Sequence, residues 1–147
     1  MKKLFTFIIL ILFFNNISAQ KYTEQYIKDA SAIGIKWWNQ VNNGEHEQSY
    51  EALASGFQNR FPLENWLNQM KGLMEEFGEV QERTIKDAYF QSKMEGFGDG
   101  FYVIIEYNVE YSKTRNHTET VLLKQNDNFE WKILDFSYTF QNKITQN

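Results

Sequence analysis

Two charged side chains occur where the surrounding sequence predicts an apolar strand face. Glu119 alternates in step with Val121, and Arg83 alternates in step with Ile85 and Tyr89. A single charge buried on such a face is costly, whereas a charge with a partner of opposite sign is tolerated. We therefore expect Arg83 and Glu119 to form a salt bridge in the folded protein.

Two roles are open for this pair. It could fix the register of the sheet, or one member could contact a ligand at the open end of the fold, with Tyr89 or Tyr102 close by. Trp38 joins these candidates because consecutive helix residues point about 100° apart. It therefore cannot share the core-facing direction of Trp37, and we expect it at the edge of the core.

Acid–base catalysis would need a carboxylate whose pKa is raised by burial. Glu119 and Asp135 are the candidates for this role, in an apolar pocket like that of a small isomerase or dehydratase. A neighbouring arginine would instead favour the ionised form of Glu119, and Asp135 is expected on the sheet surface. We therefore assign no catalytic residue.

The sequence contains no motif for a cofactor or a metal ion. It has no glycine-rich phosphate loop, no His-Glu-x-x-His and no Gly-x-Ser-x-Gly. His46 and His117 are far apart in the sequence, and both are expected in solvent. Cysteine is absent, which excludes disulfides and thiol chemistry. We expect no cofactor and no metal site.

Residues 1–19 have the layout of a secretory signal peptide. Two lysines precede the apolar run Leu4–Phe14, and a short polar stretch then ends at Ala19. The layout is typical of a peptide removed on export, and the run is about half of the ~20 residues that a membrane span needs. We expect cleavage after Ala19, leaving one domain over 20–147 that is periplasmic or secreted.

The charge of the chain restricts its partners. The formal net charge is −4, and the basic residues are scattered rather than clustered. A nucleic acid or an anionic membrane surface needs a basic patch, so we expect binding to neither, and no membrane anchor after cleavage. A small molecule or another envelope protein is the expected partner class.

Helical periodicity dominates the first half of the domain. The pattern predicts a helix over about 23–42, a short second helix over about 47–58, and a third over 63–77 that follows Pro62. The third helix has the clearest apolar stripe, with Trp66 near its centre.

Alternating apolar residues predict four strands in the second half, over about 80–90, 101–111, 118–124 and 130–140. The alternation changes parity near Ile133, which predicts a bulge that bends the last strand. Helices followed by strands favour an α+β class over interleaved βαβ units. We expect three N-terminal helices packed on a bent, four-stranded antiparallel sheet.

Several short motifs resemble those of a known family. They are Trp38 with the following Asn43-Gly44 turn, Trp66, Gly78-x4-Arg83, Asp99-Gly100-x-Tyr102-Val103, Glu119-Thr120-Val121 and Asp127-x3-Trp131-Lys132-Ile133. In these motifs the chain resembles the bacterial exported family called domain of unknown function 4019. The resemblance implies the cone-shaped fold of the nuclear-transport-factor-2-like, or cystatin-like, proteins. It implies no reaction, because none is assigned to that family.

Three functions are open at this point. The first is an exported domain that binds a small molecule or a protein without catalysis. The second is the small acid–base enzyme described above, and the third is an assembly module that forms a homodimer through its sheet. A cavity of several hundred Å³ in the interior would favour a ligand site there, whereas an interior filled by aromatic rings would not.

Overall fold

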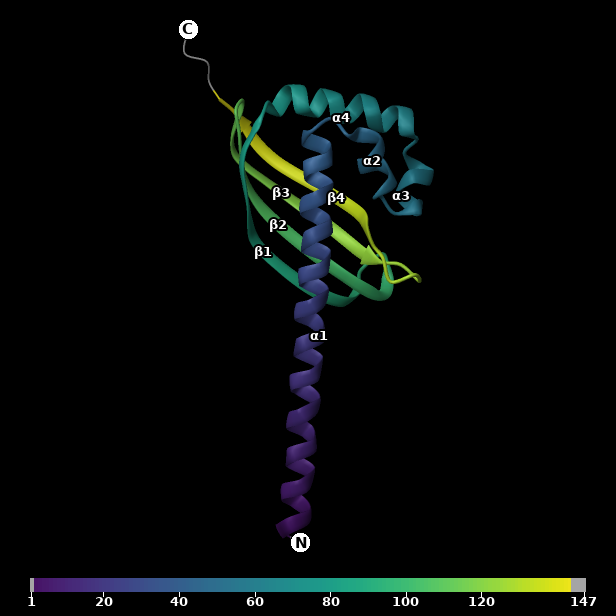
Figure 1. Ribbon diagram of the computed structural model, residues 1–147, viewed down its shortest axis with the longest axis vertical. Helices are drawn as coiled ribbons and strands as arrows, with labels where there is room; N and C mark the ends of the chain where they lie inside the picture. Colours follow the sequence, from purple (N-terminus) through teal and green to yellow (C-terminus); the bar gives the residue numbers. More distant parts are fainter. Residues whose placement is uncertain (1, 144–147) are drawn as a thin grey trace.

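The computed structural model describes residues 2–143, with side chains from Lys21 to Lys143. Helices come first and strands second, as the sequence predicts for an α+β protein (Figure 1). The elements are α1 (Lys2–Asn42), α2 (His46–Glu51), α3 (Ser55–Arg60), α4 (Leu63–Phe77), β1 (Val80–Met94), β2 (Gly98–Tyr111), β3 (Thr114–Gln125) and β4 (Trp131–Asn142).

Helix α1 is longer than predicted, because it begins at Lys2 rather than near Thr23. The sequence before Gly34 contains neither proline nor glycine, so nothing in it interrupts a helix. The second half of α1 crosses the sheet, and the first half extends beyond it (Figure 1). In the described part of the chain, no helix has the length and apolar character needed to span a membrane.

The predicted second helix is two short helices, α2 and α3. They are separated at Leu53, which forms a parallel bridge with Ile133 of β4. The N–H of Ile133 donates to the carbonyl of Ala52 at 2.9 Å, and the N–H of Ala54 donates to the carbonyl of Ile133 at 2.7 Å. These bonds replace the bonds of a continuous helix and bury the Leu53 side chain against the sheet. The prediction of a single helix is therefore wrong.

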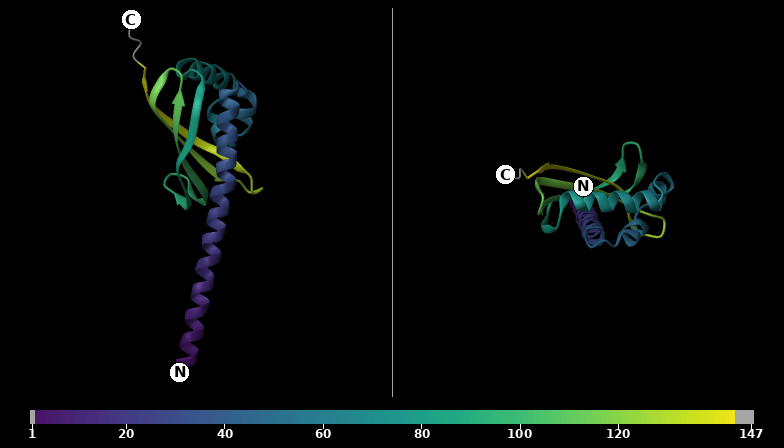
Figure 2. Two further views of the ribbon diagram at one scale, coloured as in Figure 1. Left: turned by 60° about the vertical axis from the view of Figure 1, so that its left-hand side comes forward. Right: turned by 90° about the horizontal axis from the view of Figure 1, so that it is seen from above.

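Helix α4 confirms the prediction from its apolar stripe. Its buried residues are Trp66, Met70, Leu73 and Phe77. Gly78 ends the helix with a φ of 79°, a backbone conformation that glycine adopts without strain. The helix lies across one end of the sheet, as Figures 1 and 2 show.

The four strands form one antiparallel sheet in the order β1-β2-β3-β4. The sheet curves around the second half of α1 (Figure 2). Leu122 lies opposite Asp135 whereas Leu123 lies opposite Ile133, so Leu134 is an extra residue in β4. The predicted bulge is therefore present, one residue from the expected position, and it lets both parts of β4 direct apolar side chains toward the helices.

A second bulge, in β1, is absent from the prediction. Ile85 lies opposite Tyr107, but after a register shift Tyr89 lies opposite Ile104. Because neighbouring strand residues point to opposite faces, the shift places Tyr89 on the outer face, where it is 39% exposed. The prediction that Tyr89 shares the face of Arg83 is wrong.

Aromatic side chains fill the space between the helices and the concave face of the sheet. Trp37, Trp38 and Trp66 are all fully buried, which corrects the prediction that Trp38 lies at the edge of the core. The Trp37 indole donates to the carbonyl of Ser49 on α2 at 3.0 Å, and the Trp38 ring packs edge-on to Phe136 of β4. Both tryptophans can be buried because the curved sheet and α2 together enclose more of the circumference of α1 than a flat sheet would.

Candidate functional site

The predicted salt bridge between Arg83 and Glu119 is present. Arg83 lies on β1 and Glu119 on β3, and both side chains reach across the inner face of β2. The guanidinium donates through Nε to Oε2 at 2.9 Å and through Nη2 to Oε1 at 3.2 Å. Glu119 is 1% exposed and the Arg83 side chain 8% exposed. Such a two-point pair combines charge with fixed geometry.

Three further side chains complete this ion-pair network. The Tyr111 hydroxyl donates to Glu119 Oε1 at 2.8 Å and accepts from Arg83 Nη2 at 2.8 Å. Asn42, the last residue of α1, accepts from Arg83 Nη1 at 2.9 Å. The Trp38 ring lies 5.0 Å from the guanidinium carbon, within cation–π range. The network therefore ties the end of α1 to three strands.

Tyr102 does not belong to the network, contrary to the sequence prediction. Tyr102 lies near the start of β2, whereas the network lies at the other end of that strand. Its hydroxyl donates to the carbonyl of Phe97 at 3.1 Å, and its ring lies 5.4 Å from the Lys124 ammonium. Tyr89 is also outside the network, because the bulge in β1 turns it outward. The tyrosine that the network uses is Tyr111, which shares the inner face of β2 with Val109, so its alternation could have indicated it.

His117 is buried beside the network, and the prediction that it is solvated is wrong. It is 2% exposed, and its ring packs against Phe77 with centroids 4.4 Å apart. Strand β3 begins at Thr114 rather than Thr118, which places His117 opposite Val109 on the inner face. The pattern missed it because Asn116 has a positive φ of 50° and breaks the alternation before it.

Burial and the nearby Arg83 guanidinium lower the pKa of His117 to about 4. Its Nδ1 lies 3.1 Å from the Thr114 hydroxyl, whereas Nε2 is 3.6 Å from Glu119 Oε1, too far for a hydrogen bond. The imidazole is therefore neutral at pH 7, and Arg83 alone balances the carboxylate charge.

Burial also raises the pKa of Glu119, while Arg83 and the Tyr111 hydroxyl act to lower it. Both carboxylate oxygens already accept hydrogen bonds from protein groups, so neither is directed at a substrate position. Asp135 is exposed, as predicted, and its Oδ1 accepts from the N–H of Phe136 at 2.8 Å. Among the described residues, no group of three or more His, Asp or Glu side chains could hold a metal ion.

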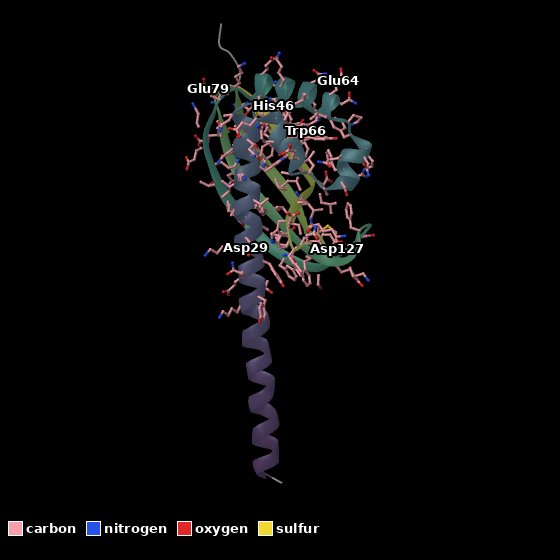
Figure 3. The ribbon with its side chains drawn as sticks, turned by 45° about the vertical axis from the view of Figure 1, so that its right-hand side comes forward. Asp29, His46, Glu64, Trp66, Glu79 and Asp127 are labelled. Carbon is pink, nitrogen blue, oxygen red and sulfur yellow. The ribbon has the colours of Figure 1, made fainter. Side chains whose placement is uncertain are left out.

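His46 is less exposed than the sequence predicts. It begins α2, is half-buried rather than solvated, and burial lowers its pKa. Its carbonyl accepts from the Trp66 indole at 3.1 Å, so its backbone supports the core (Figure 3). The predicted surface position is therefore wrong.

A groove of about 850 Å³ lies between α1, α2 and the turn that joins β3 to β4. It is an open hollow of the surface rather than an enclosed cavity. The lining residues are Asp29, Ala32, Ile33, Lys36, Trp37, Gln40, Gln48, Glu51, Ala52, Gln125, Phe129, Glu130, Trp131 and Lys132. Figure 3 places Asp29 of α1 and Asp127 of the turn at the same end of the domain, away from Trp66.

Phe129 is the most exposed large apolar side chain of this groove, at 80%. It has a φ of 63°, which is unfavourable for a bulky residue. Asn126 holds the turn, since its Oδ1 accepts from the N–H groups of Asn128 at 3.0 Å and Glu130 at 2.9 Å. The fold therefore presents an aromatic ring to solvent on a hydrogen-bonded turn.

Comparison with known families gives one match. The model of the family described as "Protein of unknown function (DUF4019)" matches residues 33–136, from the last quarter of α1 into β4. The chain belongs to this family. The matched DUF4019 region contains both the ion-pair network and most of the groove lining. No curated protein matches the chain.

Proposed function

We propose that this DUF4019 protein is exported and acts as a non-catalytic binding module, with a segment of another envelope protein held in the groove beside Phe129. The observation that carries the proposal is the exposed Phe129 ring on its fixed turn. Exposed aromatic rings beside a groove are common anchors of protein interfaces. A strained backbone at such a residue is typical of functional surfaces.

The shape of the groove favours a protein segment over a small molecule. Sites for small molecules usually enclose most of the ligand in an apolar pocket. This groove is open and combines apolar residues such as Ile33 and Trp131 with charged ones such as Lys36 and Glu51. An extended segment with alternating apolar and polar side chains suits that lining.

The buried network supports a role without catalysis. Glu119 is the buried carboxylate among the described residues, and Arg83 and Tyr111 use both of its oxygens. The concave interior beside it is filled by aromatic rings. A general acid or base needs access to the proton that it transfers, and this arrangement provides none.

The proposed function can be tested by affinity capture from an extract of the cell envelope. Phe129→Ser should abolish capture of a specific protein, because it removes the anchor from an exposed turn. Phe97→Ser is the matched control, since Phe97 is 42% exposed on the other hairpin. Equal capture by both variants, each with an unchanged unfolding midpoint, would contradict the proposed binding of a partner in the groove.

Export rests on the basic start and apolar run of residues 1–19. Intact-mass measurement of the periplasmic or secreted fraction should show a chain that begins at Gln20, with or without cyclisation to pyroglutamate. Recovery of the full-length chain in the membrane fraction alone would contradict export.

A further inference from the structure

The sheet has two edge strands, β1 and β4, which lie on opposite sides of it (Figure 1). An edge strand presents a row of backbone N–H and C=O groups that can pair with another strand. Within residues 2–143, the outer edge of β4 is bonded at Ile133, by the segment around Leu53. The stretch 134–142 has no such cover from the described residues.

The two edges differ in their protection against pairing. β1 carries register shifts at three positions and charged residues such as Lys86, Asp87 and Lys93. Bulges and charges are the usual devices that prevent edge-to-edge pairing. In contrast, residues 136–142 (FSYTFQN) contain no charge, proline or glycine, and their register shows no extra residue in β4.

The alternation along β4 determines which backbone groups are free. Both the N–H and the C=O of Ile133 point away from β3, toward Ala52 and Ala54. Because the bulge adds one residue at Leu134, the outward groups beyond it fall on even-numbered positions. These positions are Phe136, Tyr138 and Phe140, whose half-buried side chains lie on the helix-covered face. The N–H of Phe136 already donates to Asp135 Oδ1 at 2.8 Å, so the free groups are its C=O and both backbone groups of Tyr138 and Phe140.

We propose that the free edge of β4 pairs antiparallel with β4 of a second copy of this chain, with the two-fold axis at Tyr138. This residue is the centre of the free stretch 134–142. The register then places Tyr138 opposite Tyr138 of the partner subunit and Phe136 opposite Phe140 of the partner subunit. Aromatic cross-strand pairs are favourable, and no like charges oppose one another.

The same register also brings together compatible side chains on the outer face and complementary backbone groups of the two β4 strands. Ser137, which is exposed, lies opposite Thr139 of the partner subunit. The outward backbone groups of one strand meet those of the other, as an isologous two-fold interface requires. The result is a continuous eight-stranded sheet, and it depends on β4 alone rather than on the groove beside Phe129.

Charge reversal across the two-fold axis tests the proposal. The double variant Ser137→Lys with Thr139→Lys should be monomeric, because each new lysine would face a lysine of the partner subunit. The variant Ser137→Glu with Thr139→Glu should be monomeric for the same reason. A mixture of the two should form a heterodimer, since every lysine then faces a glutamate.

Sedimentation equilibrium of the purified proteins provides the measurement. The wild type should be a dimer, and each double variant should raise its dissociation constant by about tenfold or more. Thr84→Lys, on the exposed outer side of β1, is the control and should leave the dimer intact. The proposal is overturned by a monomeric wild type, by dimeric lysine variants, or by folded variants that do not recover the dimer when mixed.

Discussion

The ion-pair network buries charged side chains, whereas the groove exposes an aromatic side chain. In the network, Arg83 and Glu119 are buried and are bonded to each other and to neighbouring side chains. In the groove, Phe129 is exposed on a turn held by Asn126. The difference indicates that the buried charges hold the elements together, while the open surface remains available to a partner.

Removal of one charge from the network should have the largest effect. Glu119→Ala leaves the Arg83 guanidinium buried without its partner, so the free energy of unfolding should fall by about 3–5 kcal/mol. Urea denaturation measures the change. The double variant with Arg83→Met should recover much of the loss, because no unpaired charge remains. A cost of less than about 1 kcal/mol, typical of a surface pair, would contradict the structural role.

Truncation of the tryptophans should cost nearly as much. Trp66→Ala and Trp38→Ala should each lower the free energy of unfolding by about 3–5 kcal/mol, because both rings are fully buried. The sequence alone predicts a smaller loss for Trp38. Chemical denaturation of the two variants side by side distinguishes these expectations, and a much smaller loss for Trp38→Ala would place that ring outside the core.

Acid should weaken the network through His117. The folded state lowers its pKa from 6.5 to about 4, so the unfolded chain binds the proton more readily. The His117 contribution is fully present above pH 6.5 and is lost as the pH falls toward 4, a difference of about 3 kcal/mol. The raised pKa of Glu119 acts in the opposite direction, so a matched variant is needed to isolate the histidine.

His117→Phe provides that comparison, because a phenyl ring can pack among Phe77 and Phe140 but binds no proton. Denaturation series between pH 7 and pH 4 should show a steeper loss for the wild type than for the variant. Parallel curves would mean that His117 keeps an ordinary pKa in the folded protein.

The smallest effect on stability is expected at Phe129. Phe129→Gly relieves the unfavourable φ of 63°, so the protein should gain up to about 1 kcal/mol or remain unchanged. Thermal unfolding measures this change, and partner capture should be lost in the same variant. A clear loss of stability would show that the ring belongs to the core instead of the proposed binding surface.

Local patterns were sufficient for the features that depend on one segment. The stripe of α4 contains the residues that pack, and the parity change in β4 indicates its bulge. The pairing of Arg83 with Glu119 followed from the cost of a lone buried charge, although it joins two strands. In each case, one requirement, burial of apolar side chains or pairing of a buried charge, left few possible structures.

Features that depend on long-range contacts were missed. The bulge before Asp87 cannot be recognised from the pattern of apolar residues, because most residues of this edge strand are exposed. The break between α2 and α3 exists because Ile133 bonds to a segment about eighty residues away. The position of His117 was predicted wrongly because Asn116 breaks the alternation before it, and because its burial also depends on Phe77 from α4. None of these contact partners can be identified from the residues that are close in the sequence.

Partner capture by the double variant Arg83→Met with Glu119→Leu distinguishes recognition at the groove from recognition at the ion-pair network. This variant removes both buried charges and leaves Phe129 and the groove lining in place. If the network is structural, the folded double variant should capture the proposed envelope partner as well as the wild type does, while Phe129→Ser captures none. Loss of capture by the folded double variant would instead place recognition at the network and contradict its purely structural role.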